Sequence, residues 1–125
     1  MIRVLIAEDH AYLREQLAIL LDDSEWITVV GDADNGKKAV DLCGTLQPDV
    51  VLMEADMPFV DGFTATQMIR QQFPTIRVVI MSNGSKGEET RATQAGANAF
   101  FLKPRTSDYI IRTIRAVHEN NYHKF

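Results

Sequence analysis

The sequence predicts an α/β fold, a doubly wound parallel sheet of five strands in one domain. Two observations support this prediction. Short apolar runs alternate with amphipathic helical stretches along the whole chain, which is the pattern of a parallel sheet connected by helices. Four of these runs also end in charged or hydroxyl side chains, as expected where the carboxyl ends of parallel strands form a binding edge.

Composition restricts the class of protein. The 125 residues suffice for one domain with its own core, and 46% hydrophobic with 24% charged residues is a globular composition. The formal net charge of −4 argues against a surface built for nucleic acid. We find no apolar stretch of membrane-spanning length and no secretory signal, and the single Cys43 excludes an intrachain disulfide. A cytoplasmic protein that does not bind membranes is therefore expected.

The first third of the chain is expected to form two strands and two helices. Residues 2–7 form the first strand, and residues 27–30 form a short second strand ended by Gly31. The first helix covers residues 12–21 and carries four leucines on one face: Leu13, Leu17, Leu20 and Leu21. Asn35 is the expected N-cap of the second helix, which Pro48 ends. The apolar stripe of that helix is Ala39, Leu42, Cys43 and Leu46.

The middle of the chain contains the most apolar run. Residues 49–54 are predicted to form a third strand buried on both faces, and Glu54 follows its apolar residues directly. Asp61 and Gly62 open the third helix, and residues 76–82 form the fourth strand. The inward side chains of the third helix are expected to be Ala65, Met68, Ile69 and Phe73.

The last third is expected to contain a weakly packed helix. Residues 83–87 form a loop, and the helix at residues 88–95 has only small inward residues, such as Ala92 and Ala95, so it is expected to move. Gly96 ends it, and residues 99–102 form the fifth strand. Thr106 or Ser107 caps a last helix whose apolar positions are Ile110, Ile111, Ile114 and Val117.

The strand ends predict a site for a phosphoryl group beside a divalent cation. Right-handed crossovers most simply give the flavodoxin-like strand order 2-1-3-4-5. This order places Glu8, Asp9 and Glu54 in one crevice, with Ser82 and Lys103 on its other flank. Three neighbouring carboxylates repel one another unless a cation lies among them, and oxygen ligands favour Mg²⁺ or Ca²⁺. An ammonium and a hydroxyl group are suited to holding a phosphoryl oxygen.

Four stretches in order carry a family resemblance: VLIAEDH at 4–10, DVVLMEADMPFVDG at 49–62, VIMS at 79–82 and GANAFFLKP at 96–104. Over essentially its whole length the chain resembles the receiver domain of two-component response regulators, in particular the NarL/LuxR transcription-factor type. The resemblance implies a phosphorelay signal-transduction protein, not an enzyme and without a catalytic residue. Its partner would be a sensor histidine kinase or phosphotransfer protein, and a homodimer is plausible for the family. DNA would be reached only through an output domain, which the single receiver domain at residues 1–125 lacks.

The resemblance also implies roles for particular residues. Glu8 and Asp9 match the acidic pair that binds Mg²⁺. Ser82 matches the switch hydroxyl and Lys103 the lysine, both of which contact the phosphoryl group. Phe100 matches the switch aromatic, although a plain core role is equally expected, since phenylalanine lacks the hydroxyl group of a switch tyrosine.

The sequence departs from the family at the phosphoacceptor, where Glu54 stands in place of aspartate. One extra methylene moves the carboxylate by about 1.5 Å, and a 1 Å misplacement can cost about 10²-fold in rate, so phosphorylation of Glu54 is expected to be poor or absent. The longer acid also reaches toward Ser82 and Lys103 and partly imitates the phosphorylated state. The imitation is incomplete because a phosphoryl group brings roughly −1.5 to −2 charges and three acceptor oxygens. Glu54 is either an engineered phosphomimetic substitution or a natural feature of an atypical receiver.

Two nearby positions add to this expectation. Asp56 matches the position whose backbone carbonyl reaches Mg²⁺, and its carboxylate would either join the metal site or repel an incoming phosphate donor. Pro104 matches the cis-proline position of the family.

Two other classes compete with the signalling switch. A pseudo-receiver would act as a scaffold, independently of phosphorylation and through protein contacts alone, but the intact Glu8, Asp9, Ser82 and Lys103 speak against it. A flavodoxin-type FMN carrier or a haloacid-dehalogenase-type phosphatase shares the fold. The first needs a Ser/Thr/Gly-rich loop after the first strand, and the second needs an acid two residues beyond a nucleophilic aspartate. The sequence after residue 7 supplies neither.

Overall fold

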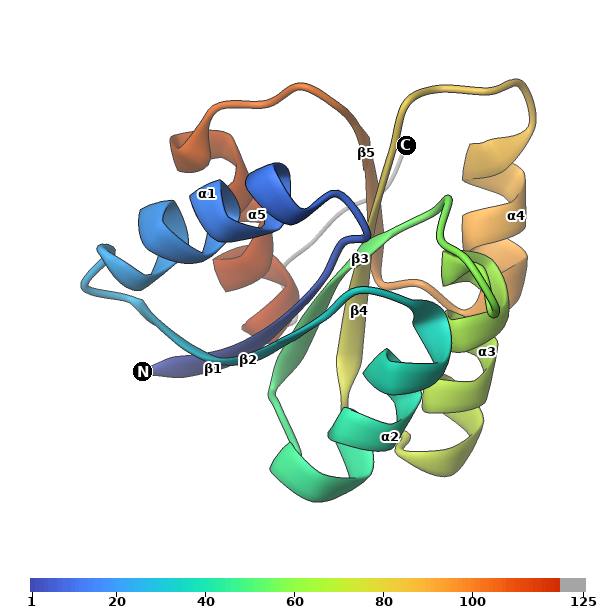
Figure 1. Cartoon of the computed structure of the whole chain (residues 1–125), viewed down its shortest axis with the longest axis horizontal. Coiled ribbons are helices and arrows are strands. Elements are labelled where there is room, and N and C mark those ends of the chain that lie inside the picture. The colour runs from blue at the N-terminus through green and yellow to red at the C-terminus, as the bar shows by residue number, and fades with distance from the viewer. Residues whose placement is uncertain (120–125) are drawn as a thin grey trace.

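The computed structural model describes residues 1–119 and contains a five-stranded parallel sheet in the predicted order β2-β1-β3-β4-β5 (Figure 1). Strands and helices alternate along the chain. Their bounds are β1 (Ile2–Ala7), α1 (Ala11–Asp22), β2 (Ile27–Ala33), α2 (Gly36–Leu46), β3 (Val50–Glu54), α3 (Gly62–Gln72), β4 (Arg77–Ser82), α4 (Glu88–Ala95), β5 (Ala99–Leu102) and α5 (Ser107–His118). Among the described residues, no helix has the length and apolar character needed to cross a membrane.

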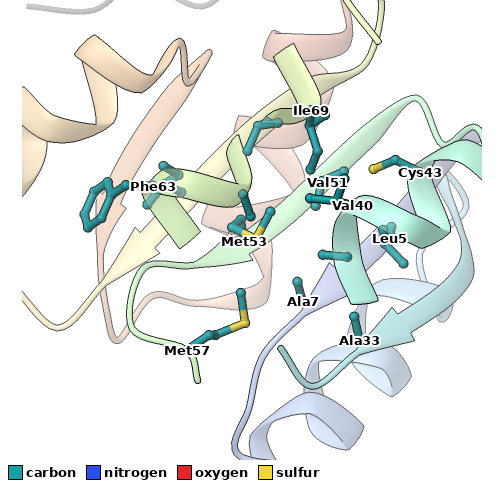
Figure 2. Close-up of a cluster of buried hydrophobic side chains, with 14 of the residues drawn as sticks. Leu5, Ala7, Ala33, Val40, Cys43, Val51, Met53, Met57, Phe63 and Ile69 are labelled. Carbon is teal, nitrogen blue, oxygen red and sulfur yellow. The ribbon is translucent and has the colours of Figure 1, made fainter. Parts of the chain in front are cut away.

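The sheet is the middle layer of three. Helices α1 and α5 cover one face, and α2, α3 and α4 cover the other (Figure 1). Side chains of β3 alternate between the two resulting cores: Val51 and Met53 pack toward α2 and α3, whereas Val50 and Leu52 pack toward α1 and α5. Figure 2 shows the first of these cores. Because β3 is buried on both faces, its sequence is apolar without alternation, as predicted.

The second strand is longer than predicted. It continues to Ala33 because the ladder with β1 contains a bulge: Val4 pairs with Val29, and the next residue, Leu5, pairs with Gly31. Gly31 therefore lies inside the strand instead of ending it. A Cβ at Gly31 would lie 2.7 Å from a methyl carbon of Leu46, so the glycine makes room for α2 to pack on the strand.

Helix α1 buries a narrower stripe than predicted. Leu17 and Leu21 are buried, but Leu20 is 48% exposed, so its assignment to the inward face was wrong. The helix packs on β1, β2 and α5 at one margin of the sheet, where a row of residues at i, i+4 spacing is enough to fill the contact.

The helix caps follow the sequence closely. The side chains of Asn35, Asp61 and Thr106 accept hydrogen bonds from backbone N–H groups in the first turns of α2, α3 and α5. Helix α4 differs, because its N-cap is Gly87, which offers no side chain, and Ala92 is its one buried residue. The expectation that α4 packs weakly is therefore confirmed.

Candidate functional site

The four polar strand ends meet at one edge of the sheet. In the ladders, Ala7 pairs with Met53, Glu54 with Met81, and Ser82 with Leu102. Glu8, Glu54, Ser82 and Lys103 follow or end these strands, so the parallel register sets all four at the same level. Glu54 stands at the tip of β3, between β1 and β4.

The centre of the site is an ammonium group held by two buried carboxylates. Lys103 Nζ donates to Glu54 Oε2 and to Glu8 Oε1, the latter at 3.3 Å. Glu8 and Glu54 are only 1% and 2% exposed. Their remaining oxygens accept backbone N–H groups: His10 N lies 3.0 Å from Glu8 Oε2, and Asp56 N lies 3.3 Å from Glu54 Oε1. The network therefore links β1, β3 and β5 through side chains.

The charge balance of this network remains negative. Burial raises the pKa of Glu54 to about 7, and repulsion from Glu8 adds to this effect, whereas the ammonium of Lys103 opposes it. Burial lowers the pKa of Lys103, but its bonds to Glu54 and Glu8 outweigh burial, so that pKa is raised overall. Burial and the neighbouring Glu8 also raise the pKa of Asp9. One ammonium thus faces three acids, which is an environment that favours a further cation.

The four predicted acidic residues share one cavity. It has a volume of about 380 Å³ and is lined by Glu8, Asp9, His10, Leu13, Glu54, Asp56, Asn83 and Lys103. Among residues 1–119, no three or more His, Cys, Asp or Glu side chains are arranged to hold a metal ion together. The donor chemistry nevertheless fits Mg²⁺, which commonly takes one or two carboxylates and completes its shell with water. The residues therefore suit a hydrated ion, not a closed protein cage.

Ser82 lies at the same edge, but its hydroxyl group faces another partner. Its side chain is buried, and Oγ donates to Glu88 Oε1 in the first turn of α4. The same Oγ accepts the Gly84 N–H at 3.0 Å, and Glu88 Oε1 also accepts the Ser85 N–H at 2.9 Å. Ser82 and Glu54 both line a second cavity, of about 320 Å³, between α3 and α4.

Glu88 was missed in the sequence analysis, although a signal was present. A serine followed three residues later by glutamate is the spacing of a capping box, and Ser85 and Glu88 have this spacing, although the helix begins later, with Gly87 as its N-cap. The glutamate does reach back to the serine N–H as the pattern predicts. Its additional bond to Ser82 depends on the loop folding back onto β4, which no local pattern reveals.

Gly62 is a further residue whose importance was missed. A Cβ at Gly62 would overlap the backbone carbonyl oxygen of Glu54, and the Gly62 N–H donates to the Ala55 carbonyl oxygen at 2.8 Å. The first turn of α3 therefore packs directly on the backbone that carries Glu54. Only a residue without a side chain allows this approach.

Two predicted residues lie near the site without touching the ion pairs. Phe100 is partly buried and packs on the core between the sheet and α2, α3 and α4, which is compatible with either of its expected roles. The peptide bond between Lys103 and Pro104 is cis, as the resemblance implied. The backbone N–H of Lys103 donates to the Ser82 carbonyl oxygen at 2.7 Å, so the two flanking residues are joined through their main chains.

Comparison with known proteins gives a consistent result. The family model for the response regulator receiver domain matches residues 4–115. The response regulator GacA of Pseudomonas aeruginosa is 36% identical over 118 residues, which cover 94% of this chain and 55% of the relative. The transcriptional regulatory protein YdfI of Bacillus subtilis is 31% identical, with 95% and 56% covered. The chain thus spans about half the length of these curated relatives.

Solved structures agree with the sequence relatives. The signal receiver domain of NarL from Mycobacterium tuberculosis superposes with a TM-score of 0.89 at 31% identity, covering 94% of this chain and 96% of that one. The response regulator domain of Thermotoga maritima CheB gives a TM-score of 0.87 at 30% identity, covering 95% and 97%.

Proposed function

From the premise that this chain belongs to the response regulator receiver domain family, we propose that it is a phosphorelay switch in which Glu54 occupies the phosphoacceptor position. One observation carries the proposal: the buried Glu54 carboxylate, at the tip of the central strand, accepts the ammonium of Lys103. A carboxylate presented to an ammonium at a strand-end crevice is the arrangement that an acceptor of phosphoryl groups needs.

Glu54 impairs phosphoryl transfer, and it also reproduces part of the contacts that a phosphorylated residue would make. The longer side chain shifts the attacking oxygen by about one bond length. It also contacts Lys103, one of the two groups assigned to the phosphoryl oxygens, while the Ser82 hydroxyl group bonds Glu88 instead. Glu54 therefore imitates a phosphorylated residue in its contact with Lys103 but not in a contact with Ser82.

Glu8 and Asp9 are the residues that would hold Mg²⁺, with Glu54 and Asp56 beside them in the same cavity. A bound Mg²⁺ supplies positive charge that offsets the negative charge of a transferring phosphoryl group. Lys103 contributes a second positive charge in the same cavity, between the carboxylates of Glu8 and Glu54. The ion and the lysine would thus neutralise the site jointly.

The proposed setting is a cytoplasmic transcriptional regulator. A sensor histidine kinase or phosphotransfer protein would donate the phosphoryl group, a homodimer would be one active form, and an output domain would contact DNA. The chain itself would be a switch and not an enzyme. A second candidate is a phosphorylation-independent pseudo-receiver, which the glutamate at position 54 favours.

The test is intact mass spectrometry after incubation with a small acyl phosphate and Mg²⁺, on this chain and on Glu54→Asp. We expect only the Glu54→Asp variant to gain a phosphoryl group. Modification of neither protein would support the pseudo-receiver. Modification of the unaltered chain would contradict the geometric argument about Glu54 and point to another acid, such as Asp9 or Asp56.

A further inference from the structure

We propose that Glu88 is a latch that holds the Ser82 hydroxyl group on the α4 side of the site, so that α4 must release Ser82 before this hydroxyl group can bind an oxyanion at position 54. Glu88 is thus a positioning residue that acts through Ser82. This inference rests on the proposed function, because it concerns how the same site recognises a phosphoryl-like group.

The first step concerns the single proton of the hydroxyl group. A serine hydroxyl donates one hydrogen bond, and the Ser82 proton is directed to Glu88 Oε1. Oxygens of a phosphoryl group are acceptors only, so they need that same proton. Glu88 and an oxyanion at position 54 therefore compete for one donor, and both bonds cannot form at once.

The second step concerns the strength of the competitor. Glu88 Oε1 accepts both the Ser82 hydroxyl group and the Ser85 N–H, the latter at 2.9 Å. Hydrogen bonds to a charged acceptor are roughly twice as strong as neutral ones, and a carboxylate in the first turn of a helix is favoured by the helix dipole. Ser82 is 1% exposed, so water does not readily replace the contact.

The third step concerns what release would move. Helix α4 has one buried residue, Ala92, and its N-cap contributes no side-chain hydrogen bond. Near its start, the guanidinium of Arg91 lies 4.1 Å from the centroid of the Phe63 ring in α3. Few interactions therefore hold the first turn, and redirecting the Ser82 hydroxyl hydrogen bond from Glu88 to a ligand would loosen it.

The experiment measures the affinity of beryllium fluoride, a phosphoryl-like anion, for the full chain in the presence of Mg²⁺. The background is Glu54→Asp, and the variants are Glu88→Ala, Glu88→Gln and the control Glu89→Ala, which removes the adjacent exposed acid of the same helix turn. We expect Glu88→Ala to raise the affinity about tenfold, the factor that a charged hydrogen bond provides. Glu88→Gln retains an acceptor oxygen and should stay within about threefold of the parent, and Glu89→Ala should have no effect.

A double-mutant cycle separates the latch from simple helix capping. If Glu88 acts through the Ser82 proton, Glu88→Ala has no effect on affinity once Ser82→Ala is also present. If Glu88 only caps α4, its removal has the same effect with or without the hydroxyl group, and the latch is refuted. Circular dichroism confirms that each variant is folded.

Amide hydrogen exchange gives a second measure that does not depend on ligand binding. In the unaltered chain, the Gly84 N–H is bonded to Ser82 Oγ, and the Ser85 N–H is bonded to Glu88. Both amides should exchange faster in Glu88→Ala but not in Glu89→Ala. If Glu54→Asp fails to bind beryllium fluoride, the proposed function fails, and exchange still decides the latch. Unchanged exchange at Gly84 would overturn it.

Discussion

The site is bordered by the ends of β4 and β5, which we call its β4 flank and its β5 flank, and their polar side chains behave differently. On the β5 side, Lys103 crosses to Glu54 and Glu8 and closes the site with buried ion pairs. On the β4 side, Ser82 is buried and bonds Glu88 of α4. The difference lies in side-chain length. The four-carbon side chain of Lys103 reaches past the end of β4 to the carboxylates that end β3 and follow β1. The short side chain of Ser82 instead bonds Glu88, which follows the loop after β4.

The comparison also separates a fixed flank from a changeable one. Lys103 is held by groups at the ends of β1 and β3, which lie inside the sheet. The partner of Ser82 lies on a helix with one buried residue. The hydrogen-bond partner of Ser82 can therefore change more readily than the partners of Lys103.

The largest effect is expected from Lys103→Met, which removes the fixed flank. It leaves Glu8 and Glu54 buried together without a cation, and breaking a buried pair in this way costs about 3 kcal/mol of unfolding free energy. Urea denaturation followed by circular dichroism measures the loss. The control is Lys37→Met, which breaks an exposed pair with Asp41 and should cost less than about 0.5 kcal/mol.

The same variant should change the dependence of stability on pH. Burial raises the pKa of Glu54 to about 7 even with Lys103 present, and loss of Lys103 raises it further. A carboxyl group with a higher pKa in the folded state binds protons more tightly when folded, so stability falls as pH rises between the unfolded and folded pKa values. Metal-free Lys103→Met should accordingly lose more stability at pH 8 than at pH 5. An equal loss at both pH values would place the unpaired charge elsewhere than on Glu54.

The next effect comes from the backbone beneath both flanks. Gly62→Ala places a methyl group against the Glu54 carbonyl oxygen, and forcing atoms into a packed site costs about 2 kcal/mol. Thermal unfolding of the variant measures the cost. Gly44→Ala is the matched control, because its Cβ would lie 3.4 Å from Phe73 within a helix. That change should be neutral or stabilising by up to about 1 kcal/mol.

The smallest effect is expected on the changeable flank. Ser82→Ala removes the hydrogen bond to the half-buried Glu88, which corresponds to about 1 kcal/mol of unfolding free energy, and it also removes the acceptor of the Gly84 N–H. The control is Ser85→Ala, since the bond between Ser85 and Glu88 comes from the backbone N–H. A loss from Ser82→Ala as large as that from Lys103→Met would remove the distinction between the flanks.

The features that were predicted correctly follow from patterns that repeat along the sequence. Alternating strands and helices determined the sheet order, and the strand ends placed Glu8, Glu54 and Lys103 together. The bulge in β2 and the exposure of Leu20 escaped prediction because both depend on how α1, α2 and β1 pack on one another. Sequence periodicity reports which residues are apolar, but not how much of a helix a neighbouring layer covers.

Within the site, the features that were not predicted have a different cause. Glu54 was expected to reach toward Ser82, because the two residues end neighbouring strands, but the Ser82 hydroxyl group donates to Glu88. That acceptor, Glu88, is six residues further along the chain, beyond a loop whose path was not predictable. The close approach of Gly62 to the Glu54 carbonyl oxygen was likewise not predicted. The sequence pattern identified the start of a helix but not the backbone on which that helix packs.

Trp26, the only tryptophan in the chain, immediately precedes β2. Because the strands are parallel, this position lies at the amino edge of the sheet, opposite the carboxylates. The guanidinium of Arg115 stacks over the indole ring at 3.6 Å from its centroid, which ties the start of β2 to the end of α5. The molecule therefore carries a native fluorophore at the edge of the sheet opposite Glu54, Ser82 and Lys103. The fluorescence emission of Trp26 can report global unfolding. A change in this emission on ligand addition would show that binding at the carboxyl edge of the sheet alters the structure at the amino edge.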